Sequence, residues 1–203
     1  MKYLKMLGLA AVAAMALMAV VGASAASATT LEIKGVAQNA AVTINATLEP
    51  GTSALLKDSA GTTTDTCTES EVHGKTTEFT TPGSAEIHGN VEKLTFGKCT
   101  HTTTVLKAGK LFVGWIPGTT DGTVTSSEAE VTVVSTAFGI SAVCKTGGGT
   151  DIGKLTGATN GGTNKTAFAT MDIEGKISCG ILGTSTWTGF YSVTSPEELA
   201  VRE

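Results

Sequence analysis

Apolar and polar residues alternate in short runs from Thr29 onward, and frequent turns separate the runs. Successive side chains of a β-strand point to opposite sides, so this alternation is typical of strands with one buried face. The clearest early example is the strand predicted at 42–48, which the turn Glu49-Pro50-Gly51 ends. Other strands are predicted at 31–33, 85–96, 103–105, 110–116, 122–126, 129–138, 141–144, 151–155, 165–173, 176–179 and 184–194.

Several stretches are predicted to interrupt or border this pattern. Residues 62–68 are polar apart from Cys67, which favours an edge strand or a loop over a central strand. Gly89-Asn90 predicts a bulge or a bend within its strand, and the dipeptide Pro82-Gly83 and the Gly-rich segments 147–149 and 160–162 predict turns. After Ser195, the sequence fits either a helix cap or a short terminal strand at 199–201.

The stretch from Leu94 to Ile116 is the predicted folding nucleus, because it combines a cysteine, a tight turn and the most apolar strand of the exported part. Alternation places Leu111, Val113 and Trp115 on one face of that strand. Phe112 and Ile116 then share the other face. Either a loop or a second sheet covers this outer face, or it forms an exposed contact patch.

The aromatic residues near the end of the chain divide in the same way. Trp187, Tyr191 and Val193 are predicted to face inward, and Phe190 to face outward. Core packing is therefore favoured over a sugar-stacking platform for the inward pair of aromatics. A contact patch on the outside would comprise Phe112, Ile116 and Phe190.

Residues 1–28 are predicted to be a signal peptide that is cleaved after export. Lys2 and Lys5 precede an uncharged apolar run at 6–21, and both 23–25 and 26–28 fit the small-x-small cleavage pattern. An uncleaved membrane anchor is the alternative, but the run is short and rich in Ala for a span of about 20 residues. The mature chain, residues 29–203, is expected to be one domain that is secreted or held at the cell envelope, with no transmembrane span after cleavage.

The charge of the mature chain argues against nucleic acid as a partner. Removing Lys2 and Lys5 changes the formal net charge from −4 to about −6, and the charged residues are scattered without blocks. Thr and Gly are abundant in the mature chain, which favours strands and turns over helices.

Four cysteines, Cys67, Cys99, Cys144 and Cys179, lie in the exported part. An even number of cysteines in an oxidising compartment predicts two disulfides, and the wide spacings lack a metal-ligand signature. Of the three possible connectivities we predict Cys67 with Cys99 and Cys144 with Cys179, because each pair closes one local block. Closing loops of about 35 residues contributes about 3 to 4 kcal/mol each in the chain-entropy model.

Motifs that carry chemistry are incomplete in this chain. The segment 148–154 matches most of a phosphate-binding loop, but Leu155 stands where a Ser or Thr would bind magnesium. The separations between His73, His88 and His101 specify no metal or catalytic geometry, and no Gly-x-Ser-x-Gly elbow occurs. We therefore predict no enzyme activity, no metal and no cofactor.

Four short motifs follow one another along the chain, at Cys67–Gly74, Leu94–Cys99, Gly149–Gly157 and Trp187–Pro196. Taken in this order, they are similar to a family of exported bacterial proteins of unknown function. They span most of the mature chain, with residues 29–60 outside them. The resemblance implies an exported, cysteine-containing β domain and provides no catalytic residues to transfer.

These observations together predict an all-β, disulfide-bonded protein, specifically an antiparallel β-sandwich of the immunoglobulin-like or a related kind. A β-helix is the alternative, but no constant repeat length appears. We expect a non-enzymatic protein that acts through surface contacts with an envelope or extracellular protein or glycan. The alternative is an extracellular module that binds a glycan or small ligand, suggested by Trp115, Trp187 and Tyr191.

Overall fold

The computed structural model describes residues 28–77, 84–135, 139–158 and 168–203. Residues 1–27 of the predicted signal peptide and the predicted turns at 82–83 and 160–162 lie outside this range. The described chain folds into strands, with one short 3-10 helix at Gly180–Leu182. In chain order the strands are β1 (Thr30–Ile33), β2 (Val36–Ala37), β3 (Thr43–Leu48), β4 (Ala54–Lys57), β5 (Thr63–Thr76), β6 (Glu86–Cys99), β7 (Thr102–Lys107), β8 (Lys110–Trp115), β9 (Gly122–Ser127), β10 (Glu130–Val134), β11 (Ser141–Lys145), β12 (Thr150–Thr156), β13 (Thr170–Ser178), β14 (Thr184–Ser195) and β15 (Leu199–Arg202).

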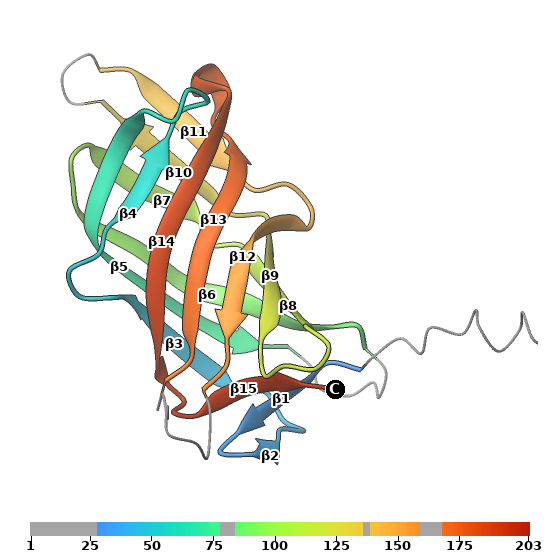
Figure 1. Ribbon diagram of the computed structural model, residues 1–203. Helices are drawn as coiled ribbons and strands as arrows, with labels where there is room; N and C mark the ends of the chain where they lie inside the picture. The colour runs from blue at the N-terminus through green and yellow to red at the C-terminus, as the bar shows by residue number, and fades with distance from the viewer. Residues whose placement is uncertain (1–27, 78–83, 136–138, 159–167) are drawn as a thin grey trace, which may run out of the picture.

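The main sheet closes on itself into an antiparallel barrel with eight strand positions (Figure 1). The order around the wall is β5, β6, β8, β9, β12, β13 and β14, and the eighth position is shared by β3 and β4. Both β3 and β4 pair with β14 on one side and with β5 on the other, which closes the ring. Strands that are consecutive in the sequence are also adjacent around nearly the whole wall.

The predicted all-β class is confirmed, but the predicted sandwich is wrong. A sandwich has two separate sheets with free edges, whereas here β3 and β4 each pair with both β14 and β5, so the main sheet closes on itself. Alternation of apolar and polar residues is the same in both architectures, because each has an inner and an outer face. The pattern therefore could not distinguish a closed sheet from two opposed sheets.

Three positions of the wall are each built from two strand segments in line. In these positions β7 continues into β8, β9 into β10, and β11 into β12, and the breaks fall at 108–109, 128–129 and 146–149. Gly109 has φ of 78°, and a Cβ atom there would lie 2.5 Å from the Ser127 carbonyl oxygen. Glycine is required at this break because neither the backbone angle nor the space permits a side chain.

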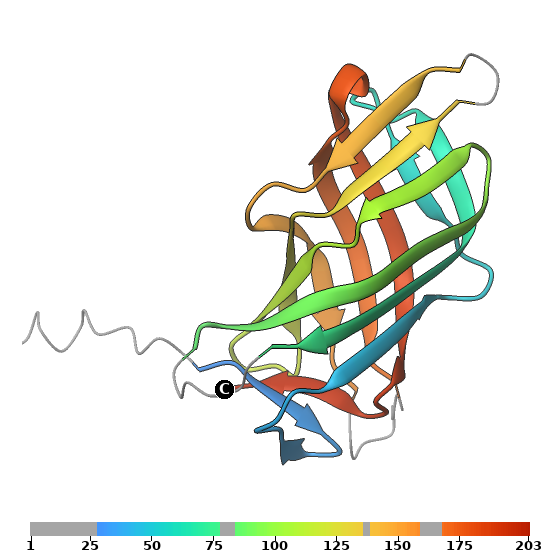
Figure 2. The same ribbon diagram turned by 180° about the vertical axis from the view of Figure 1, so that it is seen from behind.

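Beyond these breaks, β7, β10 and β11 form the upper part of the wall (Figure 2). The strand order of the main sheet ends at β7, and β11 meets β13 through one registered pair, Lys145 with Ser178. Among the described strands, β7 therefore has a free edge beside the upper half of β6. We call this three-stranded part the β7–β10–β11 sheet.

The lower end of the barrel is covered by a small sheet in the order β15–β1–β2. Leu31 of β1 and Leu199 and Val201 of β15 are buried against the barrel interior. This sheet settles the open alternative for the end of the chain, since 199–202 form a strand and not a helix. The first and last described strands, β1 and β15, therefore meet beneath the barrel.

Three predictions about individual strands are corrected by the structure. The polar stretch 62–68 contains the start of β5, which pairs with β4 over Thr63–Cys67 and with β6 from Cys67 onward, so the strand as a whole is central. Its buried Asp65 accepts three hydrogen bonds. The register shift in β6 falls beside Glu92, between Val91 and Lys93, and not at Gly89-Asn90. Residues 170–178 form one continuous strand in place of two separate ones.

Both predicted disulfides are present. Cys67 bonds to Cys99 between β5 and β6, and Cys144 of β11 bonds to Cys179 just after β13. The two bonds lie in opposite walls of the upper half, because four strand positions separate them in the ring. Disulfides form and persist in oxidising compartments, so the pair indicates an environment outside the cytoplasm.

Candidate functional site

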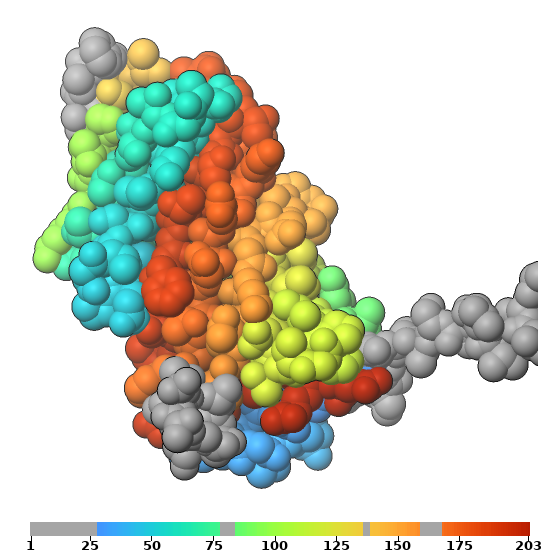
Figure 3. All heavy atoms as spheres, in the orientation of Figure 1, coloured from blue at the N-terminus to red at the C-terminus, as the bar shows by residue number. Residues whose placement is uncertain are grey.

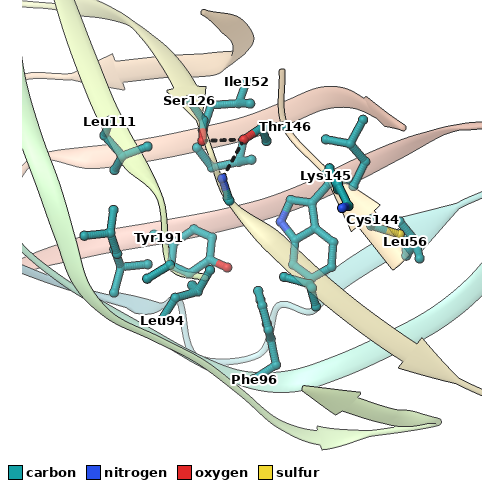
Figure 4. Close-up of a pocket in the computed structure, with 18 of the residues that line it drawn as sticks. Leu56, Leu94, Phe96, Leu111, Ser126, Cys144, Lys145, Thr146, Ile152 and Tyr191 are labelled. Atoms are coloured by element: carbon teal, nitrogen blue, oxygen red, sulfur yellow. Dashed lines mark hydrogen bonds between the residues drawn. The ribbon is translucent and has the colours of Figure 1, made fainter. Parts of the chain in front are cut away.

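A cavity of about 120 Å³ lies inside the upper half of the barrel, between the β7–β10–β11 sheet and the opposite wall. Its lining is almost entirely apolar. Figure 4 shows Leu111 and Tyr191 facing Cys144 and Leu56 across this space. The other main contributors are Val72, Leu94, Phe96, Val131, Val133, Ile152, Met171, Ile173, Ile177 and Trp187.

Strand register places these side chains inside. On the β5–β6 ladder Val72 is opposite Leu94, so both point inward, and Ser70 is opposite Phe96. Phe96 then meets Trp187 of β14 edge to face, with ring centroids 4.6 Å apart. Both rings line the upper cavity, and their contact joins two strands that are not neighbours in the wall.

The inward positions of β14 are Trp187, Gly189 and Tyr191, as the alternation predicts. A Cβ atom on Gly189 would lie 2.9 Å from Cε2 of the Tyr191 ring. The absence of a side chain at 189 thus lets the tyrosine ring lean over the strand toward Trp187. Figure 4 shows the Tyr191 hydroxyl pointing toward the middle of the lining residues.

The Tyr191 hydroxyl is the main polar group presented by this wall. It donates a hydrogen bond to Ser70 Oγ at 3.0 Å, and Tyr191 is buried, with 3% of its surface exposed. Burial raises the pKa of Tyr191, and hydrogen bonding with Ser70 and Trp187 opposes that effect. Tyr191 therefore stays a neutral hydroxyl at physiological pH.

Thr146 lies at the opposite rim of the cavity. Its Oγ1 accepts hydrogen bonds from the Ala129 amide at 3.0 Å and from Ser126 Oγ at 3.4 Å (Figure 4). Lys145 is the one charged residue that lines the upper cavity, and its Nζ lies 3.2 Å from Glu130 Oε1. The cavity wall is therefore neutral, with no unpaired cation for an ionised ligand.

A second chamber of about 80 Å³ adjoins the first in the lower half. Val72, Val91, Leu111 and Met171 line both chambers, so they form the boundary. Met171 is unbranched and adapts its shape more readily than a β-branched residue. Four apolar side chains therefore separate the two chambers.

The ends of the barrel are filled by side chains. The β15–β1–β2 sheet covers the lower end, and a cluster that includes Leu56, Val133 and the Cys144–Cys179 disulfide fills the upper end. Figure 3 shows β4, β14, β13 and β12 forming a continuous surface on one face of the molecule. The free edge of β7 lies on another side, beside β6 (Figure 2).

The predicted contact patch is not gathered into one surface. Phe112 lies on the outside of β8, where it meets the ring of His88 edge to face at 4.9 Å. Ile116 directly follows β8 and is half-buried. Phe190, which is 37% exposed, lies on the outside of β14 on the opposite side of the ring. A role of these residues in surface contacts stays a prediction.

Other candidate residues take structural positions. Cys67 and Cys99 lie close to Asp65 in the sole cluster of potential metal ligands among the described residues, but their sulfurs are in a disulfide and Asp65 accepts three hydrogen bonds. Gly153 belongs to the β12–β13 ladder and so does not form an open loop.

Among the described residues no helix is long and apolar enough to cross a membrane.

Ser70 and Asp65 are the important side chains that the sequence reasoning missed. Both are polar residues on the inward face of β5, and both are more than 95% buried. Their spacing was the available signal. Asp65 and Cys67 are two residues apart and share the inward face, and so do Ser70 and Val72, but the inward positions change from odd to even numbers between the two pairs. The overall polarity of the stretch hid this pattern.

No protein-family model, characterised protein or solved structure matches this chain. The resemblance to exported bacterial proteins therefore rests on the four short motifs alone and stays a prediction.

Proposed function

We propose that this protein is an exported binding protein that holds a small apolar molecule inside its barrel. The carrying observation is the apolar cavity of about 120 Å³. Protein interiors are normally packed as densely as organic crystals, with few voids larger than a water molecule. An apolar void of this size favours an apolar ligand, since an engineered cavity of about 150 Å³ stays dry and binds benzene.

The proposal develops the small-ligand alternative drawn from the sequence. Trp187 and Tyr191 contribute to the interior lining, which supports a small enclosed ligand over a glycan on an exposed aromatic platform. Binding inside the barrel requires no catalytic group, in keeping with a non-enzymatic role. Secretion or retention at the cell envelope is part of the proposal and is supported by the two disulfides.

Thermal unfolding in the presence of toluene tests the proposal. A ligand at ten times its dissociation constant adds about 1.4 kcal/mol to the free energy of unfolding. For a domain of this size, that stabilisation raises the melting temperature by about 3 to 5 °C. The disulfide-bonded exported chain is expected to show this increase and a saturable calorimetric signal.

Two matched variants show whether toluene binds in the cavity. Val131→Phe fills the cavity from β10, and is expected to abolish the stabilisation by toluene. Leu106→Phe adds the same ring on the outside of β7, where Leu106 is 54% exposed, and should leave the stabilisation unchanged. No stabilisation of the unsubstituted protein, or equal stabilisation of both variants, would sink the proposal.

A further inference from the structure

We infer that the cavity selects a compact ligand that carries one hydroxyl group, a small phenol or alcohol, with that hydroxyl bound at Tyr191. This inference rests on the proposed function and specifies the chemical class of the ligand. It follows from the placement of the neutral Tyr191 hydroxyl in a largely apolar space, where the other hydroxyls, Ser126 and Thr146, are hydrogen-bonded to each other and the one charged residue, Lys145, is paired with Glu130.

The Tyr191 oxygen has hydrogen-bonding capacity left for a ligand. A phenolic hydroxyl has one donor hydrogen and can also accept hydrogen bonds. The donor hydrogen is used by Ser70 Oγ at 3.0 Å, and the oxygen keeps one lone pair as an acceptor beside its interaction with the Trp187 N–H. A ligand hydroxyl that enters the cavity can therefore donate to Tyr191.

The local structure holds this oxygen in one place. Gly189 leaves the space in which the Tyr191 ring lies, and Ser70 fixes the hydroxyl from β5. Ring and hydroxyl are thus positioned by two different strands before any ligand arrives. Pre-positioned groups lose little conformational freedom on binding, which favours selectivity.

The rest of the lining excludes other classes of ligand. The lining of the upper cavity contains no unpaired charge, because Lys145 is paired with Glu130. A carboxylate or ammonium group would lose its hydration there without gaining a partner of opposite charge. A sugar carries several hydroxyl groups, and most of them would find no partner on an apolar wall. One hydroxyl on an apolar body is the composition that matches the site.

Phenol and toluene form a matched pair of probes, because they are similar in size and differ by a hydroxyl in place of a methyl group. Titration calorimetry on the disulfide-bonded exported chain is expected to show about 3- to 10-fold tighter binding of phenol, the range of one net hydrogen bond. Tyr191→Phe should remove this preference, so that phenol and toluene bind this variant with affinities within about 2-fold of each other.

Ser70→Ala provides a second variant that keeps the tyrosine. It releases the Tyr191 hydrogen for the ligand, so anisole, which can only accept hydrogen bonds, should gain about 3-fold or more relative to toluene. Near-ultraviolet circular dichroism of each variant reports whether the interior packing is retained.

The outcomes separate the two proposals. If neither phenol nor toluene binds, the proposed function and this inference both fail. If both bind with equal affinity, ligand binding stands and selection by hydroxyl is overturned. If phenol is preferred equally by the unsubstituted protein and by Tyr191→Phe, the hydroxyl binds elsewhere and the role of Tyr191 is overturned.

Discussion

In the lower half of the barrel each strand is hydrogen-bonded to both neighbours, whereas the upper half is held together in a different way. Ladders connect β6 to β8, β8 to β9, and β9 to β12 without a gap around the lower wall. In the upper wall β7 has a free edge among the described strands, and β11 meets β13 through one registered pair.

One disulfide and one buried carboxylate replace these missing ladders. The Cys144–Cys179 disulfide ties the β7–β10–β11 sheet to the region after β13. At the other edge Asp65 accepts hydrogen bonds from the His101 amide at 3.0 Å and from Thr103 Oγ1 at 2.6 Å. These point attachments leave the two outer edges of the β7–β10–β11 sheet largely without ladder pairing, and the larger of the two chambers lies behind this sheet. The comparison teaches that a barrel can gain interior space where local links substitute for continuous pairing.

The largest expected effect is that of the upper disulfide. Cys144→Ala with Cys179→Ala should lower the free energy of unfolding by about 3 to 4 kcal/mol. Amide hydrogen exchange in β10 and β11 should rise selectively, because their attachment to β13 is then one registered pair. Mass spectrometry of exchange under native conditions measures this.

The matched control for that variant is Cys67→Ala with Cys99→Ala. Its loop is nearly as long, at 32 residues against 35, so the chain-entropy loss is similar. Because β5 and β6 remain joined by a full ladder, local exchange there should change little. Equal local exchange in both double variants would contradict the difference between the two halves.

Gly153 probes the lower half. A Cβ atom there would lie 2.0 Å from the Asp172 carbonyl oxygen, and its φ is 142°. Gly153→Ala should therefore open the β12–β13 ladder and cost about 2 to 3 kcal/mol, as measured by denaturant unfolding. Gly148→Ala is the control, since no atom lies within 4 Å of the added methyl group. A loss below about 0.5 kcal/mol for Gly153→Ala would show that the lower wall tolerates local disruption.

Asp65 probes the other attachment of the upper wall. Asp65→Asn keeps the shape but replaces one accepting oxygen by an amide group that faces a donor. The expected loss is about 2 kcal/mol in the free energy of unfolding, with faster exchange in β7. Thr103→Val removes one of the three partners and should cost less than the Asp65 variant. The opposite order would show that the Thr103 hydroxyl matters through another contact.

The smallest expected effect concerns Tyr191 and alkaline pH. Burial raises its pKa, so above pH of about 10 the unfolded chain loses this proton while the folded chain keeps it. The free energy of unfolding should consequently fall as pH rises through this range, and Tyr191→Phe should fall less.

Tyr191 is also the single tyrosine of the sequence after residue 28, so phenolate absorbance reports on it alone in a protein prepared without residues 1–28. The absorbance midpoint should lie at higher pH in the folded protein than in denaturant. Equal midpoints would mean that water reaches the hydroxyl, and that the upper interior is as wet as the surface.

The alternation of apolar and polar residues was enough to predict which side chains of a strand point inward. The inward set Trp187, Tyr191 and Val193 follows from alternation, because the period of a strand is two whatever its partner. Alternation failed where polar residues face inward, as for Asp65 and Ser70, since their burial depends on partners elsewhere. Thr103 and Tyr191, the partners in question, lie 38 and 121 residues away.

The sequence by itself determined that the chain is all-β, that two disulfides close two local blocks, and which aromatic side chains face inward. Only the tertiary structure decided that the sheet closes into a barrel, that β7 keeps a free edge, and that Tyr191 meets Ser70 beside an open space. The physical reason is that the backbone of a single strand sets the direction of its side chains, whereas barrel closure and cavities depend on which strands pair with each other. Such pairing brings together residues that lie far apart in the sequence, so local spacing does not reveal it.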